Sequence, residues 1–222
     1  MAEHRLPGDI ERSSMQIIRQ EIAGLGVTLK EENAPVILRV IHATADFAYL
    51  ETLTFSPKAA ALASEALTKG TPIVTDTNMA LSGVSRPGLK KLGGEAFCFM
   101  ADPAVAEKAK RDGTTRAVAA MRHAAETLPG AILAVGNAPT ALFQIAEEIE
   151  AGLRPALVVA VPVGFVNVVE SKERIVSVCR KHNVPVIAAM GRKGGSSVAA
   201  AILNALIYSA ADLLDPAARG WN

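Results

Sequence analysis

The sequence is poor in cysteine, histidine and aromatic residues, and these shortages exclude several classes of protein. Its 222 residues include two cysteines, Cys98 and Cys179, which lie far apart and outside any C-x-x-C motif. That spacing excludes a disulfide framework and a zinc site, and it predicts free thiols in a reducing compartment. Aromatic residues make up only 4% of the chain, so the core must be built from Ala, Val, Ile and Leu. Such a composition suits an α/β domain better than a β-sandwich.

Long apolar runs and an excess of one charge are also missing. No run approaches the roughly 18 apolar residues of a membrane-spanning helix. The N-terminal residues 1–5 are polar and lack the apolar core of a signal peptide. The formal net charge is +1, so no overall field attracts nucleic acid or an anionic membrane. We therefore expect a cytoplasmic protein with neither of these partners, in which locally placed arginines hold any anionic ligand.

Helical and strand patterns alternate along most of the chain. Apolar runs typical of buried strands lie at 72–76, 97–100, 131–135, 156–161 and 185–189. Segments with helical periodicity or helix-capping signals lie at 9–22, 57–68, 102–113, 115–126, 139–151, 171–182 and 196–208. Apolar strands linked by helices form a mostly parallel sheet covered on both faces. The sequence therefore predicts an α/β fold, a three-layer α/β/α sandwich formed by one domain over residues 1–222.

His42 is the leading candidate for proton transfer among the four histidines of the chain. Imidazole is the side chain whose unperturbed pKa lies near neutrality. No other histidine, cysteine or clustered carboxylate stands at metal-ligand spacing from His42, so we expect no metal site. Residues 35–44 have helical spacing, although their β-branched content is also typical of a strand; in a helix, Arg39 and His42 share one face. The alternative is a histidine that packs on an apolar helix face, and the local sequence alone favours it.

The loops that follow the predicted strands carry the remaining chemistry. Gly191-Arg192-Lys193-Gly194-Gly195-Ser196 follows the strand at 185–189. It matches neither the P-loop nor the dinucleotide-binding motif, but a glycine-rich turn with two cations before a helix favours an anion site. The alternative is a plain turn with two solvated charges. Arg116 stands near a helix N-terminus, where the helix dipole disfavours a cation, so it is a candidate ligand contact or an ordinary surface arginine. Ser14, on the first helix, is equally open.

Seven segments that generic fold needs do not explain follow one another along nearly the whole chain. They are Ile10-Glu11-Arg12-Ser13-Ser14, Arg39-Val40-Ile41-His42-Ala43-Thr44-Ala45-Asp46-Phe47, Thr75-Asp76-Thr77-Asn78-Met79-Ala80, Gly136-Asn137-Ala138-Pro139-Thr140-Ala141-Leu142-Phe143, Pro162-Val163-Gly164-Phe165-Val166, Glu170-Ser171-Lys172-Glu173 and Gly191-Arg192-Lys193-Gly194-Gly195-Ser196. Together these segments resemble the precorrin-8 methylmutase family.

The resemblance implies a cytoplasmic, homodimeric enzyme of corrin biosynthesis. Such an enzyme moves a methyl group from C-11 to C-12 of a precorrin-8 tetrapyrrole, giving hydrogenobyrinate or its cobalt form, with neither S-adenosylmethionine nor a redox cofactor. By the same resemblance His42 is the proton donor and acceptor, and the substrate contacts are Ser14, Arg39, Arg116 and Arg192. The family also suggests a site between subunits.

The chain departs from the resembled family at one stretch. Asn167-Val168-Val169 stands where the family usually has Gly-Ala-Ala, and bulkier residues there narrow or reshape that wall of the site. Residues 76–79 and 192–195 are closer to the branch that acts on cobalt-bearing substrate. Two other functions stay open: a non-catalytic corrinoid-binding protein, and a nucleotide- or S-adenosylmethionine-dependent transferase that uses the 191–196 loop.

Overall fold

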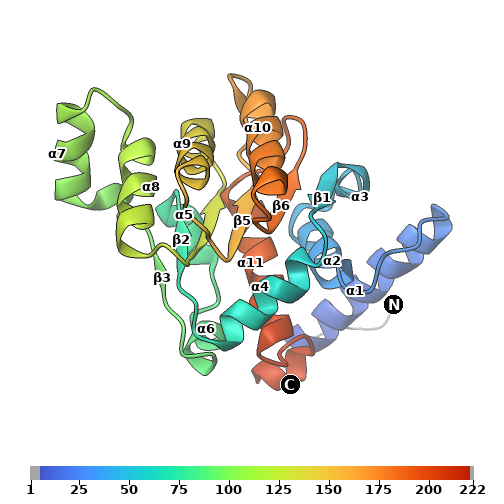
Figure 1. Ribbon diagram of the computed structural model, residues 1–222. Coiled ribbons are helices and arrows are strands. Elements are labelled where there is room, and N and C mark those ends of the chain that lie inside the picture. Colours follow the sequence, from blue (N-terminus) through green and yellow to red (C-terminus); the bar gives the residue numbers. More distant parts are fainter. Residues whose placement is uncertain (1–5, 221–222) are drawn as a thin grey trace.

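The structure, a computed structural model, describes residues 6–220; residues 1–5, on which the absence of a signal peptide was argued, and 221–222 lie outside it. A central six-stranded sheet has the order β1-β6-β5-β4-β2-β3 (Figure 1). Its neighbouring strands are parallel except for the antiparallel pair β1 and β6. The strands are β1 Leu53–Phe55, β2 Ile73–Thr75, β3 Ala96–Phe97, β4 Ile132–Val135, β5 Leu157–Ala160 and β6 Val186–Ala189.

Helices cover both faces of the sheet and give the predicted three layers (Figure 1). One layer is α8, α9 and α10, packed over Leu133 and Ile145. The opposite layer is α2, α4 and α11, packed around Ile41 and Ile202, and α1 packs against α2. The helices are α1 Pro7–Gly24, α2 Ala34–Thr44, α3 Tyr49–Thr52, α4 Ala59–Thr68, α5 Asn78–Gly83, α6 Arg86–Lys91, α7 Pro103–Arg111, α8 Arg116–Thr127, α9 Pro139–Glu150, α10 Val168–Lys181 and α11 Ser196–Ala210, with short 3-10 turns η1 Phe99–Ala101 and η2 Pro216–Arg219.

The predicted α/β architecture is confirmed, and most predicted elements are present. The apolar runs at 72–76, 131–135, 156–161 and 185–189 contain β2, β4, β5 and β6. Every residue of β4, β5 and β6 is buried, as expected for strands covered on both faces. The segment at 35–44 is a helix rather than a strand: Pro35 lies in its first turn, and its apolar face packs against α11.

Short elements departed from the sequence prediction. The three-residue strand β1 was missed, because its only strand partner is the distant, antiparallel β6. The short helices α3, α5 and α6 were also missed. The apolar run at 97–100 forms a strand only at Ala96–Phe97 and then turns. The helix expected from residue 171 begins at Val168, since Asn167 has a positive φ of 57° and Val168 is already buried in the first turn. Among the described helices, none is long and apolar enough to span a membrane.

Asp76 follows β2 at the carboxyl ends of the strands, at the point in the sheet where the order of the strands reverses. The chain leaves β2 for β3 on one side and returns to β4 on the other, and ligands of open parallel sheets bind at such a reversal. Here the Asp76 carboxylate, only 1% exposed, accepts hydrogen bonds from the backbone N–H groups of Gly136, Asn137 and Ala138, each 2.8 Å long. The protein's own carboxylate thus binds the backbone N–H groups of the turn that leads into α9.

Replacing Asp76 with alanine should destabilise the fold strongly, because three backbone N–H groups would lose a charged acceptor in a buried place. We expect Asp76→Ala to lower the free energy of unfolding by at least about 3 kcal/mol. Urea unfolding measures the change. Asp9→Ala, which removes an exposed carboxylate paired with Arg12, is the control and should cost no more than about 1 kcal/mol. Equal costs for the two variants would contradict the assigned role.

Candidate active site

A buried carboxylate joins the first helix to the second and to the C-terminal segment. Glu11 Oε1 lies 2.7 Å from Arg39 Nη2 on α2 and 2.7 Å from Arg219 Nη2 in η2. The Glu11 side chain is 7% exposed and that of Arg39 13%. Glu11 faces inward because it shares the apolar face of α1 with Ile18 and Ile22. One acidic side chain therefore pairs with two arginines from distant parts of the chain.

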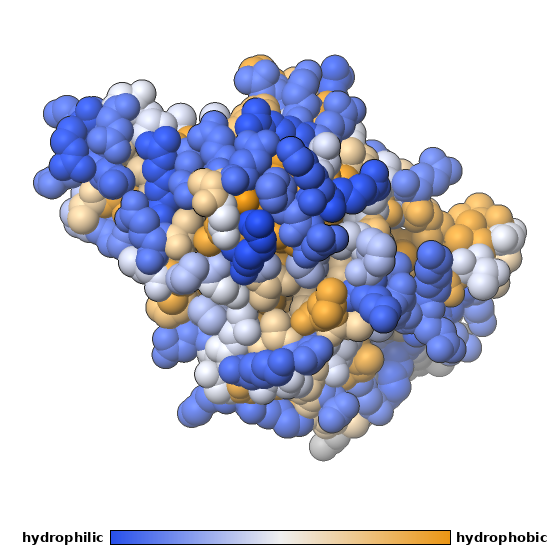
Figure 2. Space-filling view, in the orientation of Figure 1, coloured by the Kyte–Doolittle hydropathy of each residue, from blue (hydrophilic) through white to orange (hydrophobic). Residues whose placement is uncertain are grey.

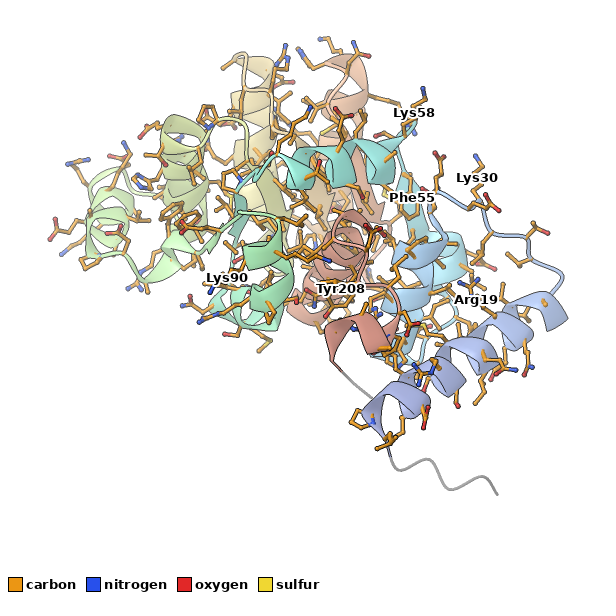
Figure 3. All side chains as sticks on the ribbon, turned by 90° about the horizontal axis from the view of Figure 1, so that it is seen from below. Arg19, Lys30, Phe55, Lys58, Lys90 and Tyr208 are labelled. Carbon is orange, nitrogen blue, oxygen red and sulfur yellow. The ribbon has the colours of Figure 1, made fainter. Side chains whose placement is uncertain are left out.

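Tyr208 completes this group, which we call the Glu11 cluster: Glu11, Arg39, Tyr208 and Arg219. The guanidinium carbons of Arg39 and Arg219 lie 5.2 and 4.6 Å from the centre of the Tyr208 ring, within range of cation–π attraction. Figure 3 shows Tyr208 on α11, the helix that packs against α2. Burial raises the pKa of Glu11, but its contacts with Arg219 and Arg39 outweigh burial and hold that pKa below its ordinary value. Glu11 is therefore ionised at neutral pH.

His42 lies one helical turn beyond Arg39, in the last turn of α2, and is partly buried. Burial lowers its pKa, and the positive charge of Arg39 lowers it further; Glu11 opposes this effect, and Arg219 reinforces it. The imidazole is therefore largely neutral at pH 7 in the free protein and able to accept a proton. Its protonated form is favoured once negative charge is brought close to it, because an opposite charge stabilises the imidazolium.

A hollow of about 460 Å³ opens beside the Glu11 cluster, between α1, α2 and residues 214–216. Met15 and Leu38 contribute apolar surface, while Arg12, Arg19 and Arg39 contribute guanidinium groups. Arg12 is paired with Asp9 and Asp215. Figure 3 shows Arg19 on α1. The hollow can accept a group that is apolar along one side and carries a carboxylate. Its lining is Glu11, Arg12, Met15, Gln16, Arg19, Pro35, Leu38, Arg39, Leu214, Asp215 and Pro216.

The Glu11–Arg39 ion pair joins α1 to α2. Along the helices, Ser14 lies on one side of this pair and His42 on the other. The helices α1 and α2 are antiparallel, since Arg19 and Ile22 share a hollow with Ala34 while Glu11 contacts Arg39. Ser14 is three residues after Glu11, and His42 is three residues after Arg39. At 1.5 Å per residue their positions differ by about 9 Å along the helices. The Ser14 hydroxyl donates to the backbone oxygen of Ile10 at 2.8 Å. Only an extended ligand could contact both residues.

The loop at 191–196 is tied to the strand ends and to the segment after α2. Lys193 Nζ lies 2.6 Å from Asp46 Oδ2, and the N–H of Gly195 donates to the oxygen of Val161 at 2.8 Å. A Cβ on Gly194 would lie 2.1 Å from the same oxygen, so only glycine fits there. Two of the groups expected to bind an anion are therefore engaged within the protein. Arg192 is exposed and lies over Phe165, 5.5 Å from the ring centre.

Arg116 lies apart from the other predicted site residues. It is the first residue of α8, is exposed, and lines a hollow with Glu107 and Lys110 of α7. The layer that contains α8 lies across the sheet from α2 (Figure 1). The structure thus associates Arg39 and His42 on one helix and links Arg192 to that region through Lys193. It does not bring Arg116 to them within one chain.

The sequence analysis did not identify several residues of this region. Glu11 had a usable signal, because it is a charged residue on the apolar face of a helix. Tyr208 and Arg219 had none, since their partners are far away in the chain. Lys172 was visible only as part of a motif, yet its side chain is fully buried. Within residues 6–220 no three His, Cys, Asp or Glu residues gather in a way that could hold a metal ion.

Comparison with known proteins places the whole arrangement in one family. The family model described as precorrin-8X methylmutase matches residues 9–209. A relative from Leptospira interrogans, named cobalt-precorrin-8 methylmutase, is 44% identical over 90% of this chain and 92% of its own. One of the same name from Salmonella typhimurium is 47% identical over 78% of this chain and 80% of its own.

A solved structure agrees with these relatives. The precorrin-8x methylmutase of Thermus thermophilus has a TM-score of 0.82 and 41% sequence identity, covering 91% of this chain and 98% of that one. The family model covers Glu11, Arg39 and Tyr208 of the Glu11 cluster and the loops at the strand ends, and it ends before Arg219. This chain belongs to the precorrin-8X methylmutase family and is a methylmutase of cobalamin biosynthesis.

Proposed function

We propose that this enzyme moves a methyl group from C-11 to C-12 of a precorrin-8 tetrapyrrole, giving hydrogenobyrinate or cobyrinate. The observation that carries the proposal is the position of His42 on α2. It lies one turn from Arg39, which is largely buried and paired with Glu11, in a chain of the methylmutase family. Substrate and product are isomers, so the methyl group needs no external donor. His42 gives one proton to the ring system, the methyl group migrates, and the proton returns to His42. No net proton, electron or group is consumed.

The substrate contacts in this proposal are Ser14, Arg39, Arg116 and Arg192. Arg39 binds Glu11 through Nη2, and a guanidinium carries five N–H groups, so it can also hold a substrate carboxylate. The hollow beside Arg39 offers apolar surface for the arm that bears this carboxylate. Ser14 and His42 are about 9 Å apart along their helices, a separation that a macrocycle can bridge.

A homodimer is part of the same proposal. Leu6, Ile10 and Ile17 are 50%, 48% and 54% exposed and lie on the side of α1 that also presents Ser14. Such an apolar stripe on a helix suits burial against a second copy of the chain. Figure 2 shows further apolar surface at the far end of α1, where Leu25 and Val27 are exposed. A second chain would also explain Arg116, which one chain alone leaves remote from His42.

We propose a cobalt-bearing substrate and a cytoplasmic location. The names of the Leptospira and Salmonella relatives support the former. The free cysteines Cys98 and Cys179 support the latter. Transfer from S-adenosylmethionine or a nucleotide finds less support, because Gly195 N–H and Lys193 of the 191–196 loop already have protein partners.

Replacing His42 should abolish conversion but not binding. We expect His42→Ala to lower kcat at least about a hundredfold while it still binds the coloured product, because binding relies on the arginines. Conversion is followed by the visible spectrum with metal-free and cobalt-bearing substrate. The control is His123→Ala. His123 lies on α8 and makes an edge contact with Phe99, so this variant should keep wild-type turnover. Retained turnover in His42→Ala would rule out the proton-transfer role. Binding by the wild type without any conversion would favour a corrinoid-binding protein.

The charged residues of the Glu11 cluster should shift the pKa of His42: Glu11 raises this pKa, and Arg39 and Arg219 lower it. The free protein should show a His42 pKa below 6.5. Glu11→Gln removes the one opposing negative charge and should lower this pKa further, whereas Arg39→Gln removes a positive charge and should raise it. Proton NMR of the imidazole measures both, with His42→Ala assigning the signal. Shifts of the opposite sign would contradict this electrostatic account.

Charge on the exposed side of α1 should weaken the dimer. We expect the wild type to sediment as a dimer. The double variant Ile10→Lys, Ile17→Lys should shift the equilibrium towards monomer, because burying two charged lysines in the interface costs free energy. Leu62→Lys places the same charge on α4 at a leucine that is 42% exposed and should leave sedimentation unchanged. A wild-type monomer at micromolar concentration would refute the dimer.

A further inference from the structure

Lys172 has a side chain with no exposed surface, and within residues 6–220 no carboxylate pairs with it. It lies on α10, is 0% exposed, and donates from Nζ to the backbone oxygens of Gly191 and Lys193, both at 2.8 Å. Burial lowers its pKa to about 8, so the ammonium form still predominates at pH 7. Its hydrogen-bond partners are neutral carbonyl groups.

An ammonium buried without an opposite charge is costly. The effective penalty for taking such an ion out of water is several kcal/mol, and two carbonyl acceptors offset only part of it. A loop that merely had to turn would need no such group, since glycines at 191, 194 and 195 already permit the turn. Natural sequences keep costly local choices mainly at functional sites. The buried ammonium therefore indicates that the exact position of the 191–193 loop matters for function.

The contacts of the loop fix the direction of one side chain in particular. The oxygens of Gly191 and Lys193 turn inward to Lys172, and the oxygen between them, that of Arg192, accepts the N–H of Gly164 at 3.3 Å. With its backbone held on both sides, Arg192 extends outward over the Phe165 ring. Phe165 itself is 83% exposed, and Val166 beside it is 77% exposed.

We propose that Lys172 is a positioning residue that holds the 191–193 loop so that Arg192 and Phe165 form one wall of the substrate site. This inference rests on the proposed function, in which Arg192 contacts the tetrapyrrole. The wall combines a flat apolar surface with a cation at its edge, which suits a macrocycle that carries carboxylate arms. The neighbouring Lys193 binds Asp46, four residues after His42, so the wall is connected to the helix that carries the proposed acid.

The test is a double-mutant cycle between Lys172 and Arg192 in the full-length enzyme. Lys172→Met keeps the length and removes the donor. We expect it to raise KM for the cobalt-bearing substrate about tenfold, the value of one charge-assisted hydrogen bond, with kcat within about twofold. Arg192→Gln should raise KM similarly. The double variant should match Arg192→Gln alone, because Lys172 acts through Arg192. Multiplied effects, or a loss confined to kcat, would overturn the proposal.

Controls separate this role from folding and from the proposed function. Lys181→Met changes an exposed lysine of the same helix and should leave KM unchanged. Thermal unfolding reports whether each variant is folded. Should Lys172→Met not fold, Lys172→Arg takes its place and, by keeping the donors, should retain a KM near that of the wild type. Failure of both to fold would assign Lys172 to stability alone and overturn the proposal.

The wild-type reaction distinguishes the two levels of inference. A wild type that converts no precorrin-8 substrate refutes the proposed function. A wild type that converts it, while Lys172→Met keeps the wild-type KM, refutes only the role of Lys172. Phe165→Ala tests the wall directly, because so exposed a side chain can be removed without unfolding. We expect a several-fold rise in KM, because the macrocycle loses the apolar surface of the wall; an unchanged KM would exclude Phe165 from the wall.

Discussion

The buried Asp76 carboxylate is the interaction on which the carboxyl edge of the sheet depends. It joins the end of β2 to the first residues after β4 through three backbone N–H groups. Those N–H groups lead into α9, so the carboxylate also lies close to the positive end of that helix. Asp76 thus uses the protein's own N–H groups at the place where an open parallel sheet usually binds a ligand. In the proposed function, Arg192 contacts the substrate from the neighbouring strand ends, where Lys193 of the loop after β6 binds Asp46 beyond α2.

Lys172 mirrors Asp76 with the opposite charge. Asp76 collects donors from the loop after β4, and Lys172 collects acceptors from the loop after β6. Both bind backbone groups, so each fixes the path of a loop whatever side chains the loop carries. In the proposed wall, Arg192 and Phe165 are exposed side chains, and Arg192 lies on the loop path that Lys172 fixes. The binding of backbone groups also limits what can replace Asp76 and Lys172, because either loop would otherwise keep unpaired polar groups in a dry place.

The sequence predicted what repeats and missed what depends on distant partners. Apolar strands and capped helices can be predicted from local sequence, because the pattern that identifies each element is contained in about ten residues. β1 could not be predicted, since its three residues are strand only when paired with β6. The Glu11 cluster shows the same limit for the site. His42 and Arg39 were identified through a family resemblance and one helical turn of spacing, whereas Arg219 meets Glu11 across more than two hundred residues. Arg116 was predicted for the same site and lies in the opposite helical layer.

In the proposed function, the charges around Glu11 link substrate binding to proton transfer. Burial and the positive charges of Arg39 and Arg219 lower the pKa of His42 in the free protein, and Glu11 opposes them. A substrate carboxylate bound at Arg39 would offset the positive charge of that arginine. Each unit by which the His42 pKa then rises corresponds to about 1.4 kcal/mol of more favourable protonation. The free enzyme would thus hold a weak base, and the complex would hold an acid close to neutral pKa. The same arginine that binds the substrate would decide when His42 carries the proton that the methyl shift requires.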